Sequence, residues 1–137
     1  MFRWLRGRFR KSPPPLTGAP AVRRQKTHSA ASGYVYQYCY EGRRTAVRGE
    51  ETGTEYVFLV SAGRKTSFPL SVFVSSDAAG EWERRHGREL RSNEQYAVAK
   101  MALFQAFDER PDPAAMREDV RVRPADLDAI LESLGLD

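Results

Sequence analysis

A run of alternating tyrosines constrains the fold of this chain more than any other feature. Tyr34, Tyr36, Tyr38 and Tyr40 are separated from one another by single residues of another kind. Side chains two residues apart share one face of a β-strand, and tyrosine is frequent in strands. The pattern therefore predicts a strand with one aromatic face, and a fold that contains a sheet.

Three further segments have the composition of strands. Glu41 and Gly42 form a tight connection to a short strand over 43–48. After a turn, residues 54–61 are apolar on both faces, as expected of an interior strand, and residues 68–75 follow a second turn. Sequential strands joined by short turns pair as neighbours. The sequence thus predicts a four-stranded antiparallel meander.

Helical patterns follow the strands. A helix over 76–86 ends at Gly87, a residue suited to the left-handed position after a helix, and a longer one over 92–110 begins at Ser92. A third helix covers 124–134 at amphipathic spacing. The predicted class is α+β, with two to three helices packed on one face of the sheet.

Short links complete this prediction. Residues 112–119 are expected to be exposed, and residues 120–123 to form an extended connection to the last helix. The helix over 92–110 is expected to begin with a capping box of Ser92 and Gln95.

The first 32 residues differ from the rest in charge. They hold eight of the 22 Lys/Arg and none of the 18 Asp/Glu, so the remaining chain has 14 Lys/Arg against 18 Asp/Glu. Prolines and small polar residues over 12–32 leave too little apolar surface to order this segment by burial. We predict a disordered, Pro-rich basic arm over 1–32 and a single α+β domain over 33–137.

A basic arm is typical of proteins that bind polyanions, nucleic acid above all. Tyrosines on one sheet face can also stack unpaired bases, and arginines on the adjoining strand can grip a phosphate backbone. The predicted aromatic surface is Tyr34, Tyr36, Tyr38 and Tyr40. The predicted polyanion-binding residues are Arg3, Arg6, Arg8, Arg10, Lys11, Arg23, Arg24, Lys26, Arg43 and Arg44.

Other partners remain open at this point. The arm is equally suited to an acidic protein, an anionic membrane surface, or the net acidic body of its own chain. Non-specific nucleic-acid binding is the leading hypothesis. The alternative is a protein-interaction or self-associating domain, a homo-oligomer among them.

The sequence contains no catalytic motif. One cysteine, Cys39, and two histidines, His28 and His86, cannot form a Cys/His zinc site, and we expect neither metal nor cofactor. No apolar run approaches the roughly 20 residues that span a bilayer. The single cysteine favours a reducing cytoplasm, and 18 Arg against 4 Lys favours a bacterial source. We expect a non-enzymatic cytoplasmic protein.

Overall fold

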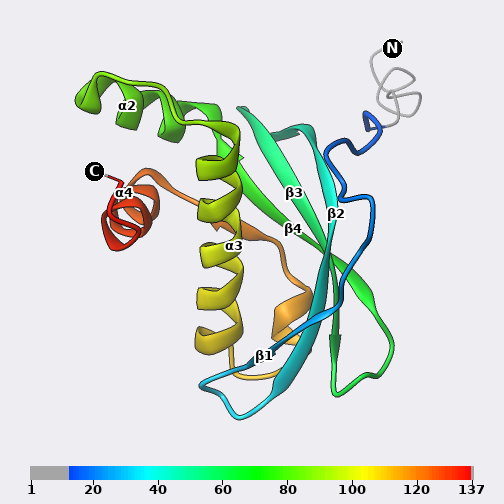
Figure 1. Ribbon diagram of the computed structural model, residues 1–137. Helices are drawn as coiled ribbons and strands as arrows, with labels where there is room; N and C mark the ends of the chain where they lie inside the picture. Colours follow the sequence, from blue (N-terminus) through cyan, green and yellow to red (C-terminus); the bar gives the residue numbers. More distant parts are fainter. Residues whose placement is uncertain (1–12, 137) are drawn as a thin grey trace, which may run out of the picture.

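The computed structural model describes residues 13–136, which form a curled sheet with three helices on one side (Figure 1). The α+β class predicted from the sequence is confirmed. The strands are β1 (Lys26–Ser29), β2 (Val35–Arg48), β3 (Glu51–Ala62), β4 (Phe68–Ser75) and β5 (Val120–Val122). The helices are α2 (Ser76–His86), α3 (Ser92–Glu109) and α4 (Pro124–Ser133), with a short 3-10 helix η1 (Ala115–Arg117) before β5.

The sheet has five strands, in the order β1-β2-β3-β4-β5. β1 to β4 are antiparallel neighbours, whereas β5 pairs with β4 in parallel. Parallel pairing needs a crossover connection, which α2 and α3 provide between β4 and β5. The predicted four-stranded, wholly antiparallel sheet is therefore wrong at both edges.

The first two predicted strands are one continuous strand. β2 runs through Glu41 and Gly42, where its register against β3 shifts. Gly42 has a φ of 127°, a conformation that glycine adopts without steric cost. This is a β-bulge, which bends a strand without ending it. Bulges and tight turns use the same residue types, so composition alone predicted a turn here.

The segment over 26–29, predicted to belong to a disordered arm, forms the edge strand β1. Its residues pair with β2 from Ser29 opposite Val35 to Lys26 opposite Tyr38. Upstream, Thr17 and Arg43 exchange two backbone hydrogen bonds of 2.8 Å each. Backbone pairing with an existing edge requires no apolar side chains, so the composition of the arm did not reveal it. Residues 1–12 of the predicted arm lie outside the described residues.

The link between α3 and α4 is also more ordered than predicted. Met116 of η1 is fully buried, within a segment that was expected to be exposed. Residues 120–122, predicted to be an extended link, form β5. Both differences arise because β4 offers a free edge and apolar neighbours to a segment that carries no pattern of its own.

The helix boundaries follow the predicted signals closely. The Ser75 side chain accepts the Ala78 N–H at 3.0 Å, and Gly87 adopts the left-handed conformation after α2. At α3 the cap is Arg91, whose N–H donates to the Glu94 carboxylate at 2.8 Å, and not the predicted Ser92. Within residues 13–136, no helix has the length and apolar content needed to cross a membrane.

The core lies between the helices and the sheet. Tyr36 and Phe58 of the sheet meet Leu103 and Phe107 of α3 and Trp82 of α2, and all five are fully buried. The Tyr36 and Phe107 rings stack with 4.5 Å between their centroids. Burying each large apolar side chain contributes about 1.5 to 3 kcal/mol. The helices therefore determine which face of β2 is the inner face.

Candidate functional site

A groove opens at the edge of β2, where the preceding segment leaves the sheet. Thr17 and Lys26 both pair with β2, but the residues between them do not. The groove has a volume of about 510 Å³ and lies between this segment, β2 and the first turns of α3. Every second residue of the segment lines it, so the segment is extended with one face toward the groove: Gly18, Pro20, Val22, Arg24 and Lys26.

Cationic side chains line the groove without any acidic one. Arg24 and Lys26 come from the N-terminal segment and Arg43 comes from β2, while no Asp or Glu is among the lining residues. Within residues 13–136, none of these three cations forms an ion pair. A concave site with charge of one sign concentrates ligands of the opposite sign. The groove is therefore complementary to an anion.

Lys100 of α3 places a fourth cation beside Lys26. Burial lowers the pKa of Lys100, and the adjacent Lys26 ammonium lowers it further. The Lys100 Nζ also lies 5.9 Å from the centroid of the Phe104 ring. Across the described residues Lys100 has no carboxylate partner within ion-pair distance. Two neighbouring ammonium groups without a carboxylate repel each other, and a bound anion relieves that repulsion.

Three tyrosines complete the groove: Tyr38 and Tyr40 of β2, and Tyr96 of α3. The Tyr40 and Tyr96 rings contact each other, with 4.8 Å between centroids. Burial raises the pKa of all three, although Arg43 opposes the shift at Tyr40, so their hydroxyls stay protonated. The Tyr40 hydroxyl is buried beside the Arg43 guanidinium. Ser92 and Asn93 lie at the same end of the groove.

The four tyrosines of the predicted aromatic surface lie in different environments, and Tyr38 lines the groove although it is largely buried. Tyr36 is 0% exposed and Tyr38 is 6% exposed, because Phe104 and Phe107 of α3 pack against them. The alternation of tyrosines therefore marks the inner face of the sheet. Tyr34 is 42% exposed but lies outside the groove lining, and Tyr40 is half-buried within it.

The structure separates the predicted cationic residues into three groups. Arg24, Lys26 and Arg43 lie together in the groove. Arg23 does not line it, and its Nε lies 2.5 Å from the Glu41 carboxylate. Arg44 is also absent from the groove, since it binds a carboxylate elsewhere. The remaining predicted residues lie outside the described part of the chain: Arg3, Arg6, Arg8, Arg10 and Lys11.

Glu55 is the carboxylate that Arg44 binds. Arg44, Arg48 and Ser71 each donate to the Glu55 carboxylate at 2.5 Å. Burial alone would raise the pKa of Glu55, but the three hydrogen bonds outweigh it and leave the pKa below the ordinary value. Glu55 pairs along the sheet with Phe73, which lies outside the core cluster beneath the helices. The hydrogen bonds to Glu55 therefore connect β2, β3 and β4 on the face of the sheet away from α3.

The remaining candidates for chemistry have structural contacts. The His86 Nδ1 lies 2.9 Å from the Trp82 carbonyl oxygen, and its ring stacks on the indole at 4.2 Å. Burial raises the pKa of the Cys39 thiol, and the Glu41 carboxylate adds to the shift, so Cys39 is a weak nucleophile. Among residues 13–136, no cluster of three or more His, Cys, Asp or Glu is placed to hold a metal ion.

The predicted site residues did not include Tyr96, Ser92 and Asn93, which line the groove, or Lys100, which lies beside its lining residue Lys26. One signal was present, because Tyr96, Lys100 and Phe104 recur at intervals of four along α3. That spacing places a lysine within an aromatic stripe of the helix. A lysine within the aromatic stripe of a helix therefore indicates, from the sequence alone, a cation at the edge of the buried face.

Comparison with known proteins gives no relative. No protein-family model matches the sequence, and neither the curated proteins nor the solved structures include a significant match.

Proposed function

We propose that this protein is a non-enzymatic module that binds nucleic acid non-specifically, holding backbone phosphates on Arg24, Lys26 and Arg43. The observation that carries the proposal is the groove itself, which is concave, cationic and free of acidic lining residues. Lysine and arginine contacts with phosphates release counterions, and this release supplies most of the affinity of non-specific binding. Backbone contacts carry no sequence information, so the binding is indifferent to sequence.

The N-terminal basic segment supports the same proposal. Arg24 and Lys26 are the last two cations of an acid-free stretch, and their side chains line the groove. Five further cations precede them within the first 12 residues. The segment that forms one wall of the groove therefore continues, in the sequence, from the most basic part of the chain. Electrostatic attraction of this kind weakens as salt is added.

A salt titration of matched variants tests the proposal. The full-length protein and an Arg24→Ala/Lys26→Ala/Arg43→Ala variant would be titrated with labelled oligonucleotides at several salt concentrations. Each lost phosphate contact lowers the slope of log affinity against log salt by about 0.7 to 0.9, so the triple variant loses about 2.1 to 2.7 in slope. Residual binding is expected from the cations of residues 1–12.

A control with the same change in net charge separates the groove from bulk charge. Lys65, Arg84 and Arg117 are exposed and lie outside the groove, on the β3–β4 connection, α2 and η1. A Lys65→Ala/Arg84→Ala/Arg117→Ala variant is expected to keep the slope of the unmodified protein to within about 0.5. Equal losses in the two triple variants would refute the groove as the binding site, and salt-insensitive binding would refute the proposed function.

A further inference from the structure

We propose that the groove takes a single strand, and seats one of its phosphodiesters between Lys26 and Lys100. This inference rests on the proposed function, and adds the form of nucleic acid and the pair of side chains that fixes it.

The register between β1 and α3 places the two lysines together. His28 stacks on Phe104 with 4.9 Å between ring centroids, and its Nε2 lies 2.9 Å from Asp108 Oδ1. Lys26 is two residues before His28 on the same side of β1, and Lys100 is four residues before Phe104 on α3. Two strand residues and four helix residues both advance about 6 to 7 Å. Lys26 and Lys100 therefore lie opposite each other, about 6 to 7 Å from the contact between His28 and Phe104 toward the N-terminal ends of β1 and α3.

The pair is held in place without a compensating acid. Asp108 of α3, which contacts β1, is occupied by His28 and by the Ala31 N–H at 3.0 Å. Arg24 and Arg43, the other charged residues of the groove, are also cations. The stack on Phe104 and the bond to Asp108 thus hold β1 against α3 while the two ammonium groups repel. A phosphodiester oxygen bound between them converts that repulsion into two charge-assisted hydrogen bonds.

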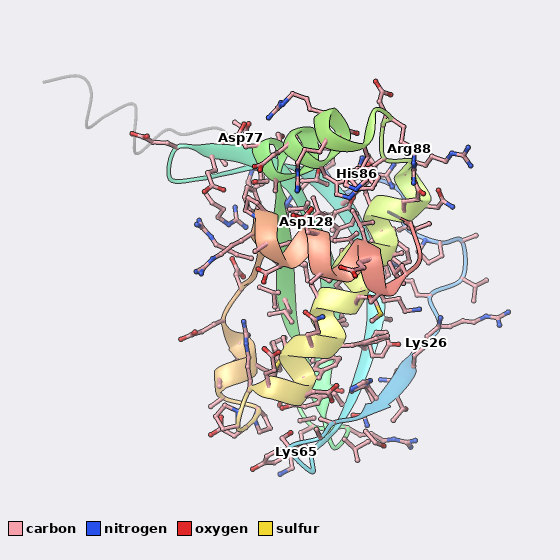
Figure 2. The ribbon with its side chains drawn as sticks, turned by 90° about the vertical axis from the view of Figure 1, so that its left-hand side faces the viewer. Lys26, Lys65, Asp77, His86, Arg88 and Asp128 are labelled. Carbon is pink, nitrogen blue, oxygen red and sulfur yellow. The ribbon has the colours of Figure 1, made fainter. Side chains whose placement is uncertain are left out.

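The different exposure of the two lysines favours a single strand, because Lys26 lines the groove and Lys100 lies beside it. Lys26 is exposed, whereas Lys100 is half-buried on the helix behind it, and Figure 2 shows Lys26 at the start of β1. A duplex carries its phosphates on a wide convex surface, so it reaches the exposed Arg24 and Lys26 but not Lys100. A volume of about 510 Å³ falls within the 300 to 1,000 Å³ typical of small-ligand sites, so it accommodates about one nucleotide. A single strand can also place an unpaired base against Tyr40 or Tyr96.

A lysine substitution that removes charge but keeps length tests the inference. The full-length protein would be titrated with a 12-nucleotide oligothymidine, a 12-base-pair duplex and polyphosphate. We expect the single strand to bind about tenfold more tightly than the duplex. In Lys100→Met, single-strand affinity should fall about tenfold, because a hydrogen bond to a charged group is lost, while duplex affinity stays within about twofold. Polyphosphate, which has no bases, should bind less tightly than the oligothymidine.

The same variant gives a second readout that a merely structural lysine would not give. Removing the repulsion should raise the melting temperature of the ligand-free protein by about 2 to 4 °C. Lys26→Met should show the same combination of higher stability and weaker single-strand binding. Lys65→Met is the matched control, because Lys65 lies on the β3–β4 connection away from Lys26 (Figure 2), and it should change neither quantity.

Each contrary result has a distinct meaning. Equal affinity for single strand and duplex would overturn the preference for a single strand and leave the proposed function standing. A lower melting temperature in both lysine variants, or unchanged single-strand affinity in both, would overturn the Lys26 and Lys100 site. If neither nucleic acid binds in a salt-dependent manner, the proposed function itself fails.

Discussion

Among single residues, Glu55 holds a buried carboxylate at the junction of three strands. It is 5% exposed, and three donors from β2 and β4 converge on its carboxylate. Because the donors include two arginines, removing the carboxylate leaves Arg44 partly buried without an acidic partner, and leaves Arg48 with Asp119 alone, at 3.6 Å. Breaking one side of such a pair is more costly than the net value of the pair itself.

Glu55→Gln is therefore expected to destabilise the protein by about 3 kcal/mol at neutral pH. Denaturant unfolding measures this change, and Glu50→Gln is the matched control, since Glu50 is exposed at the β2–β3 turn. The control should lie within about 0.5 kcal/mol of the unmodified protein. Similar unfolding midpoints for the two variants would contradict the assigned role of Glu55.

The pH dependence of stability follows from the same carboxylate. Its pKa in the folded state lies below the ordinary value, so protonation favours the unfolded chain. The stabilisation is therefore complete above the unfolded-state pKa of about 4.3, and is lost as the pH falls through the lower folded-state value. Unfolding midpoints measured between pH 7 and pH 3 should fall less steeply in Glu55→Gln than in the unmodified protein. Parallel curves would contradict this assignment.

Among the elements, β1 depends on side chains from α3 to stay at the sheet edge. Asp108 binds both His28 and the Ala31 N–H, and these bonds lower the pKa of its carboxyl. β1 has only four residues, so few backbone bonds hold it. A short edge strand of this kind opens locally before the rest of the fold.

Asp108→Ala should loosen β1 selectively. Loss of a hydrogen bond worth about 1 kcal/mol predicts about fivefold faster amide hydrogen exchange in residues 26–31. Amides of β3 should exchange at the unmodified rate. Glu109→Ala, on the neighbouring exposed residue, is the control and should leave β1 unchanged. Uniform acceleration across the sheet would show that Asp108 supports the whole fold and not β1.

The bulge in β2 is a second feature at the scale of an element. A Cβ at Gly42 would lie 2.8 Å from the Thr17 carbonyl oxygen and 3.0 Å from the Leu16 Cβ, and its φ of 127° is strained for other residues. The absence of a side chain there is what allows the N-terminal segment to cross β2. That crossing is one end of the groove.

Gly42→Ala is therefore expected to cost about 2 to 3 kcal/mol and to displace residues 16–17 from β2. Gly33→Ala is a useful comparison, because Gly33 also has a positive φ but no neighbour within 4 Å of the added Cβ. It should cost only about 1 kcal/mol. Chemical denaturation gives both values, and equal costs would show that backbone strain, and not the contact with the N-terminal segment, decides the effect.

For the whole molecule, the N-terminal segment divides into two parts with different roles. Residues 26–29 belong to the sheet, and every second residue from Gly18 to Lys26 lines the groove. Residues 1–12 add five cations to the chain. Removal of residues 1–12 therefore removes five cations, whereas removal of residues 1–32 also removes β1 and one wall of the groove.

A protein beginning at Pro13 should fold with the stability of the full chain and keep salt-dependent binding at a smaller slope. One beginning at Gly33 should lose binding and also melt at a lower temperature. Removal of β1 removes His28, and so exposes the Phe104 and Phe107 rings on which His28 stacks. Thermal melts and salt titrations of the two truncations distinguish these outcomes. Equal binding by both truncations would place the binding site elsewhere on the domain.

The sequence by itself determined the class of the fold and most of its helix ends. Caps and periodicity are local, so Ser75, Gly87 and the apolar spacing of the helices predict their elements without knowledge of neighbours. The tyrosine alternation likewise predicts a strand. It did not identify which strand face would be covered, because a tyrosine face suits both a core and a binding surface.

Only the tertiary structure decided the two edge strands, the bulge at Gly42 and the groove. β1 and β5 form because β2 and β4 offer free backbone edges, a condition that no local pattern records. The groove combines Lys26, Arg43 and Tyr96, which are far apart in the chain, and Lys100 lies beside Lys26. Their proximity depends on strand register and on the packing of α3. The sequence by itself showed an excess of cations near the N-terminus. Only the fold brought Arg24 and Lys26 of this segment together with Arg43 and Lys100.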